Sequence, residues 1–299
     1  MGEAKLVGAD DGFKARVAPL WTEEKLGILA GYVQKFSVAC RGKSPWYALD
    51  LFAGGGLNYS ESKRELVKGS PLILLDAGPP EAEMAVKVVM AEKDDQAFAA
   101  LAHRTKGYGD RAHPFHSDSN SAIEEMLAGV PKWAPTFAFL DPEGSELDWE
   151  TVRAIARHKE GHSRWKVEQL ILFSDAGVLR LAREYPDYVT RVFGHERWKS
   201  IRDRREAGLL TADQSRTEYV RMYASGLKTD LHYDIVHERQ ILTPEGRPMY
   251  FLVFASDHPA GGDIMDNRFD RVRFDPQEAQ GQGTLFTSTT APRRRRLEN

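Results

Sequence analysis

The sequence predicts a doubly wound α/β fold, with a mostly parallel sheet between two layers of helices and a hairpin near the end of the chain. Three observations support this prediction. Short apolar runs alternate with helical patterns between residues 46 and 173, as right-handed βαβ units require. Two longer strand patterns follow at 233–242 and 249–255. A turn signal at 243–246 joins them into a hairpin.

The first expected element is a helix over 22–39, which precedes the first strand. Thr22 suits the N-cap position, and the acidic residues that follow it, Glu23 and Glu24, suit the positive end of the helix dipole. Apolar residues then recur at helical spacing, so one face of this helix is expected to pack on a neighbour.

The parallel strands are indicated by short apolar runs that end in turn residues. The first run, at 46–52, ends in glycines, and the others lie at 85–90, 115–117, 137–140 and 167–173. Helices are expected between them from residue 70 and at 94–104, 121–128 and 148–158. Ser70 can cap the first of these helices, and Pro71 can occupy its first helical position.

The composition divides the chain into three parts. Residues 1–20 are an N-terminal extension, and residues 21–274 form the α/β domain. A charged helical insertion is expected within this domain at about 195–223, over one end of the sheet. From residue 275 the chain is rich in Gln, Gly, Ser, Thr and Arg, which predicts a disordered tail.

The bulk numbers favour a soluble cytoplasmic protein. The 299 residues carry a net charge of -3, so nucleic-acid binding would need a local basic patch. The single cysteine, Cys40, excludes an intramolecular disulfide and fits a reducing compartment. No signal peptide is recognisable, and no apolar run approaches the ~18 residues of a membrane span.

The glycine stretch after the first strand predicts a ligand site. Its pattern is Asp-x-Phe-x-Gly-x-Gly, formed by Asp50, Phe52, Gly54 and Gly56. Glycines there permit a tight turn and let a ligand approach the backbone. A nicotinamide fingerprint would need a third glycine where Tyr59 stands, and no P-loop motif is present. The pattern therefore favours a less anionic ligand, with cationic groups that Asp50 can attract.

Acidic residues follow four strands of the predicted sheet: Asp50, Glu92, Asp118 and Asp141. Ligands of open α/β sheets bind beyond the carboxyl ends of the strands. Glu92 could accept both ribose hydroxyls of a nucleoside, and Asp118 could accept the adenine amino group. Each residue could instead be a turn or cap residue, but their common register predicts a nucleoside-type cofactor, S-adenosylmethionine.

The stretch Asp141-Pro142-Glu143-Gly144 stands where amino-methyltransferases carry Asp-Pro-Pro-Tyr. In that design the carboxylate and a backbone carbonyl hold the target amine while the aromatic ring stacks on the base. Asp141 and Pro142 are retained here, but the aromatic residue is missing, so stacking on a flipped base is not supported. Asp141 could still act as a base or an orienting acceptor, or it could cap the following turn.

Taken together, these stretches resemble the bacterial three-Cys-motif partner proteins, which are encoded beside a radical-SAM-like protein with three cysteines. The resemblance covers about residues 15 to 270. The matching residues are Lys25–Leu26, 50–54, 69–72, 140–142 with Gly144, Trp149, Phe193 and Gly194 with Trp198, and 250–256 with His258. It implies a class I methyltransferase-like fold, five parallel strands with a C-terminal hairpin, and a radical-SAM-type partner. It implies no substrate, and Glu143 replaces the usual aromatic residue of the Asp-Pro-x-Gly signature.

The family pattern also brings Lys25 and His258 into the candidate site, with Glu143, as substrate-side or accessory residues. The alternative for Lys25 is a solvated helix residue. A further basic stretch at 197–205 surrounds Trp198, which suits nucleic acid, but interleaved acidic residues favour a solvated helix face. Two histidine pairs, His113 with His116 and His158 with His162, could suggest a metal site. They lack nearby cysteines and a His-Glu-x-x-His motif, so no metal site is predicted.

The tail contains a short peptide, Gln282-Gly283-Thr284-Leu285-Phe286, that looks like the motif by which bacterial DNA-repair and replication proteins dock on the sliding clamp. Leu285 and Phe286 would enter a groove while Gln282 fixes the register. Four arginines at 293–296 would add attraction to DNA phosphates or an acidic surface.

Two functions from different classes fit the sequence. The main hypothesis is an S-adenosylmethionine-dependent methyltransferase that acts on a nucleic acid or nucleotide in bacterial DNA maintenance, alongside the three-Cys radical-SAM-type partner. The alternative is a non-catalytic scaffold for that partner, recruited through the tail. A nicotinamide enzyme is a third, disfavoured by Tyr59 and Asp50.

Overall fold

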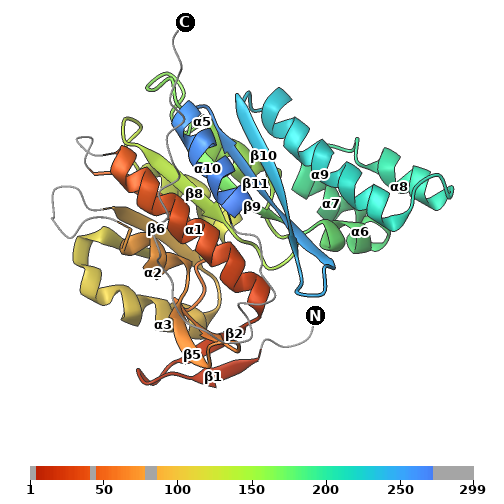
Figure 1. The fold of residues 1–299 in the computed structure, drawn as a ribbon. Helices are drawn as coiled ribbons and strands as arrows, with labels where there is room; N and C mark the ends of the chain where they lie inside the picture. Colours follow the sequence, from red (N-terminus) through yellow and green to blue (C-terminus); the bar gives the residue numbers. More distant parts are fainter. Residues whose placement is uncertain (1–4, 41–44, 78–85, 272–299) are drawn as a thin grey trace, which may run out of the picture.

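The structure, a computed structural model, describes residues 5–40, 45–77 and 86–271. Its centre is a seven-stranded sheet with the order β10-β11-β9-β8-β3-β6-β7 (Figure 1). Five strands are parallel: β3 (Tyr47–Asp50), β6 (Lys87–Glu92), β7 (Ala112–His116), β8 (Thr136–Leu140) and β9 (Glu168–Phe173). The hairpin of β10 (Ile235–Leu242) and β11 (Pro248–Ser256) closes the sheet, with β11 antiparallel to β9. This confirms the predicted Rossmann-like, methyltransferase-type sheet.

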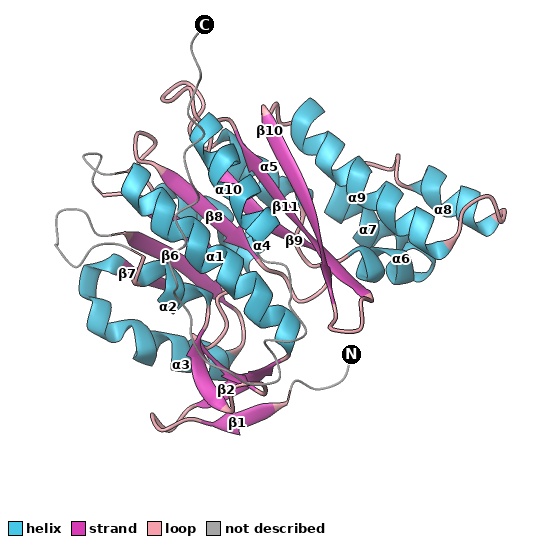
Figure 2. Cartoon of the chain, in the orientation of Figure 1, coloured by secondary structure: helices cyan, strands magenta, loops and turns pink. Residues whose placement is uncertain are grey.

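Helices cover both faces of the sheet because successive strand residues point to opposite sides. Each face of the sheet therefore carries its own hydrophobic core, with Ala48 of β3 in the core of the first face and Leu49 in the core of the second. The first face is covered by α1 (Leu20–Ala39), α2 (Ser70–Leu75), α3 (Asp95–Thr105) and α10 (Pro259–Arg271), and the second by α4 (Ser119–Ala128) and α5 (Trp149–Arg157) (Figure 2). Among the described residues, no helix is long and apolar enough to cross a membrane.

A second sheet, which the sequence did not predict, lies beyond the carboxyl ends of the parallel strands (Figure 1). Its order is β1-β2-β4-β5, from β1 (Leu6–Gly8), β2 (Lys14–Ala18), β4 (Leu57–Ser60) and β5 (Glu65–Lys68). These strands have three to five residues and bury few of them, so they lack the apolar runs that mark the central strands. Two of them lie in the predicted N-terminal extension, ahead of the helix.

The segment between β9 and β10 is a helical arm rather than one charged helix. It contains α6 (Asp175–Glu184), α7 (Pro186–Phe193), α8 (Lys199–Glu206) and α9 (Ala212–Thr229). The sequence predicted helix only at 195–223 and missed α6 and α7. Trp198 is fully buried and its indole N–H donates to the Thr190 hydroxyl at 3.0 Å, so it cannot stack on a base. Arg197, Lys199, Arg202 and Arg204 pair with carboxylates, as expected of a solvated face.

Two helix caps differ from the predictions, and one helix was not predicted. Helix α1 begins at Leu20 with Pro19 as its N-cap, and the Thr22 N–H donates to the Pro19 carbonyl at 2.9 Å. Gly69, not Ser70, caps α2, which leaves the Ser70 hydroxyl beside Asp50. Helix α10 was not predicted. The residues of the predicted tail peptide, Gln282, Leu285 and Phe286, lie outside the described residues.

Candidate functional site

Four acidic residues meet at the carboxyl edge of the central sheet, as their positions in the sequence predict. Strand β3 lies between β6 and β8, so Asp50, Glu92 and Asp141 follow three adjacent strands. Asp118 follows β7, the edge strand beside β6. The structure therefore brings the predicted acidic residues to one edge, where a doubly wound sheet binds its ligands.

Asp50 is the most deeply placed of these groups. It is 0% exposed, and neither carboxylate oxygen has a hydrogen bond of good geometry within the described part of the chain. Burial raises the pKa of Asp50 to about 7; the Ser70 hydroxyl opposes the rise and the nearby Asp141 carboxylate adds to it. Weaker opposition comes from the Phe52 N–H and the Lys25 ammonium. An incompletely bonded buried carboxylate favours a cationic or hydrogen-bond-donating ligand.

Asp141 does not cap the following turn but pairs with Lys25. The Lys25 ammonium contacts the Oδ2 atom of Asp141, and both side chains are largely buried, at 10% and 18% exposed. The same ammonium lies 5.9 Å from the centre of the Tyr250 ring on β11, whose hydroxyl donates to the Trp21 carbonyl at 3.0 Å. Lys25 is thus not the solvated residue of the alternative prediction. Burial raises the pKa of Tyr250, and Asp141 adds to the effect.

The glycine loop has the backbone that its sequence requires. Gly54 and Gly56 have φ values of 59° and 84°, in the left-handed region where a side chain is strained. A Cβ on Gly54 would meet no atom within 4 Å, so the loop has open space on that side. The chain then enters β4 rather than a helix and returns at Gly69, whose N–H donates to the Gly56 carbonyl at 2.8 Å. The predicted helix α2 therefore still begins beside the loop.

Glu92 and Asp118 each use one carboxylate oxygen for local structure. Glu92 Oε1 accepts the Asp94 N–H at 2.7 Å, and Asp118 Oδ1 accepts the Ser121 N–H at 3.1 Å as the N-cap of α4. Asp118 is exposed, and Glu92 is half-buried. Among the described residues, no hydrogen bond engages Glu92 Oε2 or Asp118 Oδ2. Both carboxylates keep an oxygen for a ligand, although Asp118 is also the cap residue of the alternative prediction.

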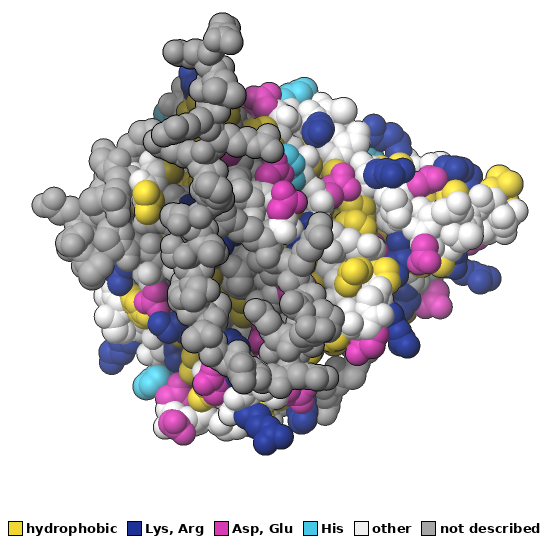
Figure 3. All heavy atoms as spheres, viewed as in Figure 1, with side chains coloured by type: hydrophobic (Ala, Val, Ile, Leu, Met, Phe, Trp, Pro, Cys, Tyr) yellow, Lys and Arg dark blue, Asp and Glu magenta, His cyan; other side chains and the backbone are white. Residues whose placement is uncertain are grey.

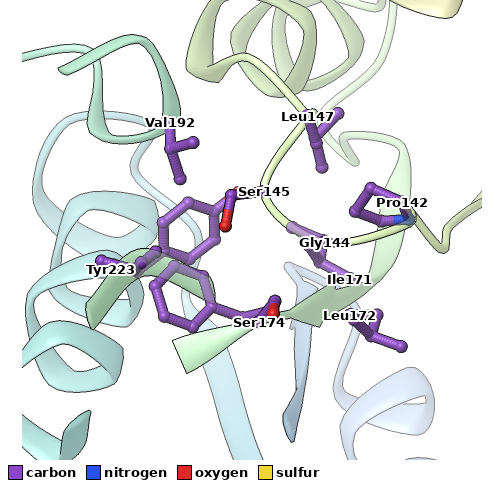
Figure 4. Close-up of a pocket in the computed structure, with 11 residues that line it drawn as sticks. Pro142, Gly144, Ser145, Leu147, Ile171, Leu172, Ser174, Val192 and Tyr223 are labelled. Atoms are coloured by element: carbon purple, nitrogen blue, oxygen red, sulfur yellow. The ribbon is translucent and has the colours of Figure 1, made fainter. Parts of the chain in front are cut away.

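The loop after β8 presents Glu143 at the surface and Pro142 toward the interior. Glu143 pairs with Arg16 of β2, and its N–H donates to Glu146 Oε1 at 2.9 Å. Beneath this loop is a cavity of about 10 Å³, room for one water. Figure 4 shows the cavity between this loop, the end of β9 and the arm, with the Ser145 and Ser174 hydroxyls beside it. A space of this size is too small for a substrate.

His258 does not join this group, which corrects the family-based expectation. Strand β11 runs antiparallel to β9, with Phe251 opposite Phe173 and Ala255 opposite Gln169. Its end therefore lies at the amino edge of the parallel strands. From Tyr250 to Ser256, the last residue of β11, the strand spans about 20 Å at ~3.3 Å per residue. There His258 contacts the Trp165 ring, 4.8 Å between centroids.

Several residues of the site were missed by sequence reasoning. Arg16, Asp11 and Arg104 make ion pairs at the two loops, although their sequence neighbourhoods carry no motif. Asp175 follows β9 and is 0% exposed; it pairs with Arg216 of α9 at 2.6 Å. Its position after an apolar strand was the one available signal. Within the described ranges, no three His, Cys, Asp or Glu side chains group as metal ligands.

Other residues of the resemblance pack the arm on the sheet. Trp149 is buried, and a Cβ on Gly194 would lie 2.2 Å from its ring. Gly194 also ends α7 with a φ of 71°. Phe193 and Trp198 belong to the same core. These positions are therefore structural, whereas Lys25, Asp50 and Asp141 form the polar group.

Comparisons with known proteins are distant. No family model and no curated protein matches the chain, so the three-Cys-motif resemblance stays a prediction. Among solved structures it is similar to a Legionella pneumophila protein, with 11% identity over 78% of this chain and 84% of that chain and a TM-score of 0.48. It is also similar to an O-methyltransferase from Bacillus cereus in complex with SAH, with 11% identity over 76% of this chain and 79% of that chain and a TM-score of 0.41. A third similar structure is M. jannaschii TYW2 in complex with AdoMet, with 13% identity over 86% of this chain and 87% of that chain and a TM-score of 0.37. Because these TM-scores are below 0.5, the fold assignment rests on the strand order of the chain itself.

Proposed function

We propose that this chain is an S-adenosylmethionine-dependent methyltransferase. The observation that carries the proposal is the charge balance of the buried group at the carboxyl edge. One ammonium, on Lys25, faces two carboxylates, Asp50 and Asp141, and Asp50 lacks well-formed hydrogen bonds. These three side chains have one positive charge fewer than negative charges, and Asp50 lacks well-placed hydrogen-bond donors. A cofactor that carries an ammonium and a sulfonium fits this imbalance.

The remaining residues fit the same cofactor. Gly54 leaves open space where a ligand could approach the backbone, and Glu92 keeps an oxygen for ribose hydroxyls. Asp118 keeps an oxygen for an adenine amino group. When bound, the cofactor supplies an electrophilic methyl group. Asp141, held by Lys25, would orient the acceptor, and Pro142 would fix the path of the loop.

We extend the proposal to a nucleic acid or nucleotide acceptor in bacterial DNA maintenance. The helical arm supports it, because residues 175–229 contain 11 Lys and Arg against 8 Asp and Glu in a chain of net charge -3. Figure 3 shows cationic side chains over the arm, interleaved with acidic ones with which several of them pair, so the support comes from the small excess of cations. The arm begins at the carboxyl edge. A local basic surface is what an anionic acceptor requires of an acidic protein. The three-Cys radical-SAM-type partner is proposed from the sequence resemblance alone.

Calorimetry with S-adenosylmethionine tests the cofactor. We expect saturable binding by the full chain and a loss of at least about tenfold in affinity in Glu92→Ala, since a ribose contact would be lost. Glu150→Ala, an exposed change on α5, is the matched control. An intact protein that shows no heat of binding, with Glu92→Ala indistinguishable from it, would exclude the proposal.

A non-catalytic scaffold remains the second candidate, and the Lys25–Asp141 pair is the observation that favours it. The pair occupies the carboxylate that an acceptor amine would need. This function predicts copurification with the radical-SAM-type partner and no cofactor turnover. Turnover in a methyl-transfer assay with labelled cofactor and DNA would contradict it.

For recruitment, we propose that the tail peptide at Gln282, Leu285 and Phe286 binds a bacterial sliding clamp. The full chain should be retained on immobilised clamp, and a chain without residues 282–299 should not. The double variant Leu285→Ala with Phe286→Ala separates the peptide from the four arginines. Equal retention of all three proteins would dismiss this route.

A further inference from the structure

Arg104 of α3 lies directly under the glycine loop. Its side chain is 4% exposed, and one of its terminal nitrogens donates to the Gly55 carbonyl. A Cβ on Gly55 would lie 3.3 Å from that nitrogen, and one on Gly56 would lie 3.6 Å from Arg104 Cδ. The guanidinium therefore packs against the loop as well as bonding to it. A side chain at position 55 would crowd this contact.

The same guanidinium holds the N-terminal segment. Its Nε and Nη2 atoms donate to the two oxygens of Asp11, at 2.7 and 3.1 Å, and Nη2 also donates to the Lys14 carbonyl at 3.3 Å. The two-point contact fixes the orientation of Asp11 as well as its distance. Arg104 lowers the pKa of Asp11, so this carboxylate stays ionised.

Residues 5–18 are here called the strap. From the contact with Arg104 the strap continues to the loop after β8. Strand β2 pairs in parallel with β4, which leaves the glycine loop directly. Arg16 then pairs with Glu143 in the loop after β8. The strap thus contacts the glycine loop through Arg104 and the loop after β8 through its own Arg16.

We propose that Arg104 is a positioning residue that couples the strap to the glycine loop, so that cofactor binding and docking of the strap stabilise each other. The inference rests on the proposed cofactor. Arg104 would not touch the cofactor, but its bond to the Gly55 carbonyl sets the loop that does. Two segments held by one guanidinium share its ordering cost, so ordering one favours ordering the other.

The test uses the full chain and its Arg104→Lys variant, which keeps the charge but not the planar set of donors. We expect Arg104→Lys to weaken S-adenosylmethionine binding by about tenfold. Asp11→Asn, which leaves the Gly55 contact intact, should weaken it by a smaller factor. Arg157→Lys on the exposed face of α5 is the control and should bind as the parent does.

Hydrogen exchange distinguishes coupling from a general loss of structure. In the parent, the cofactor should slow exchange at 6–18 as well as at 52–57. In Arg104→Lys both segments should exchange faster, and the cofactor should no longer protect 6–18. Protection of the strap that persists in Arg104→Lys, or exchange that changes in only one segment, overturns the proposal.

Failure of the cofactor proposal gives a different result. If the parent binds no S-adenosylmethionine, the inference is still tested without cofactor. Asp11→Asn must then raise exchange at 52–57, the loop that Arg104 contacts, while Arg157→Lys must not. An unchanged glycine loop in Asp11→Asn overturns the coupling.

Discussion

Lys25 and Asp141 are 116 residues apart in the chain and form an ion pair at the carboxyl edge of the central sheet. The pair joins the helix that precedes the sheet to the loop that follows its central strands. It also sets the charge beside Asp50, since the ammonium faces both carboxylates. The energetics of the site therefore depend on a residue that belongs to none of its loops.

Lys25→Met should destabilise the protein by about 2–4 kcal/mol, because it leaves a largely buried carboxylate unpaired. Urea unfolding measures the change. Lys25→Met combined with Asp141→Leu should recover part of the loss, since both charges are then removed. The control is Arg153→Met, which breaks an exposed pair with Glu150 and should cost less than about 1 kcal/mol. A Lys25→Met cost no larger than the control would contradict burial of the pair.

The raised pKa of Asp50 predicts a pH dependence of stability. Its pKa rises from 3.8 in the unfolded chain to about 7 in the folded protein, so the folded state binds more protons between these values. Its contribution to the free energy of unfolding is full below pH 4 and is lost as the pH rises through 7. Asp50→Asn should remove this dependence and gain stability over the parent at pH 8, by at most about 4 kcal/mol. Thermal unfolding from pH 4 to 9 checks it, with the exposed Asp187→Asn as control.

The buried Tyr32 hydroxyl donates to Glu168, and removing it should matter most at alkaline pH. Burial raises the pKa of Glu168 to about 7, while the hydrogen bond from Tyr32 opposes that rise. Tyr32→Phe should therefore raise the pKa further and make ionised Glu168 costlier. We expect a loss of about 1–3 kcal/mol at pH 8 and a smaller loss at pH 5, measured by chemical unfolding at both values. An equal loss at both pH values would mean that Glu168 does not titrate in this window.

Gly194→Ala should destabilise the attachment of the arm. The new methyl group would lie 2.2 Å from the Trp149 ring, on a backbone with a φ of 71°. Gly208→Ala is a matched control, because Gly208 has a φ of 73° with nothing within 4 Å of the added carbon. The control isolates backbone strain of about 1–2 kcal/mol, and Gly194→Ala should exceed it by a further ~1–3 kcal/mol of overpacking. Similar melting temperatures for the two variants would argue against this packing.

The sequence predicted the central sheet and the positions of its acidic residues because both follow from short apolar runs. Asp50, Glu92 and Asp141 stand where such runs end, so strand ends place them at one edge. The roles of their neighbours could not be predicted. The Lys25 and Arg104 pairs depend on where two helices lie in space, and no local pattern encodes that.

Two errors have definite physical origins. His258 was placed near the site because the family pattern includes it, but an antiparallel strand carries the chain to the opposite edge. The small sheet was missed because its strands bury too few residues to show a period of two. For the basic stretch around Trp198, burial of the ring excludes base stacking and agrees with the solvated helix face that the sequence favoured.

The parallel pairing of β2 with β4 also has a consequence for the order of folding. Arg16 pairs opposite Asn58, so the strap leaves the ribosome 42 residues before its partner strand. At ~5–20 residues per second, that interval is about 2–8 s. During this time the first strands have no sheet to join, although the helix after them can form. We therefore expect the earliest ordered residues of the chain to reach their final positions after the glycine loop has been made.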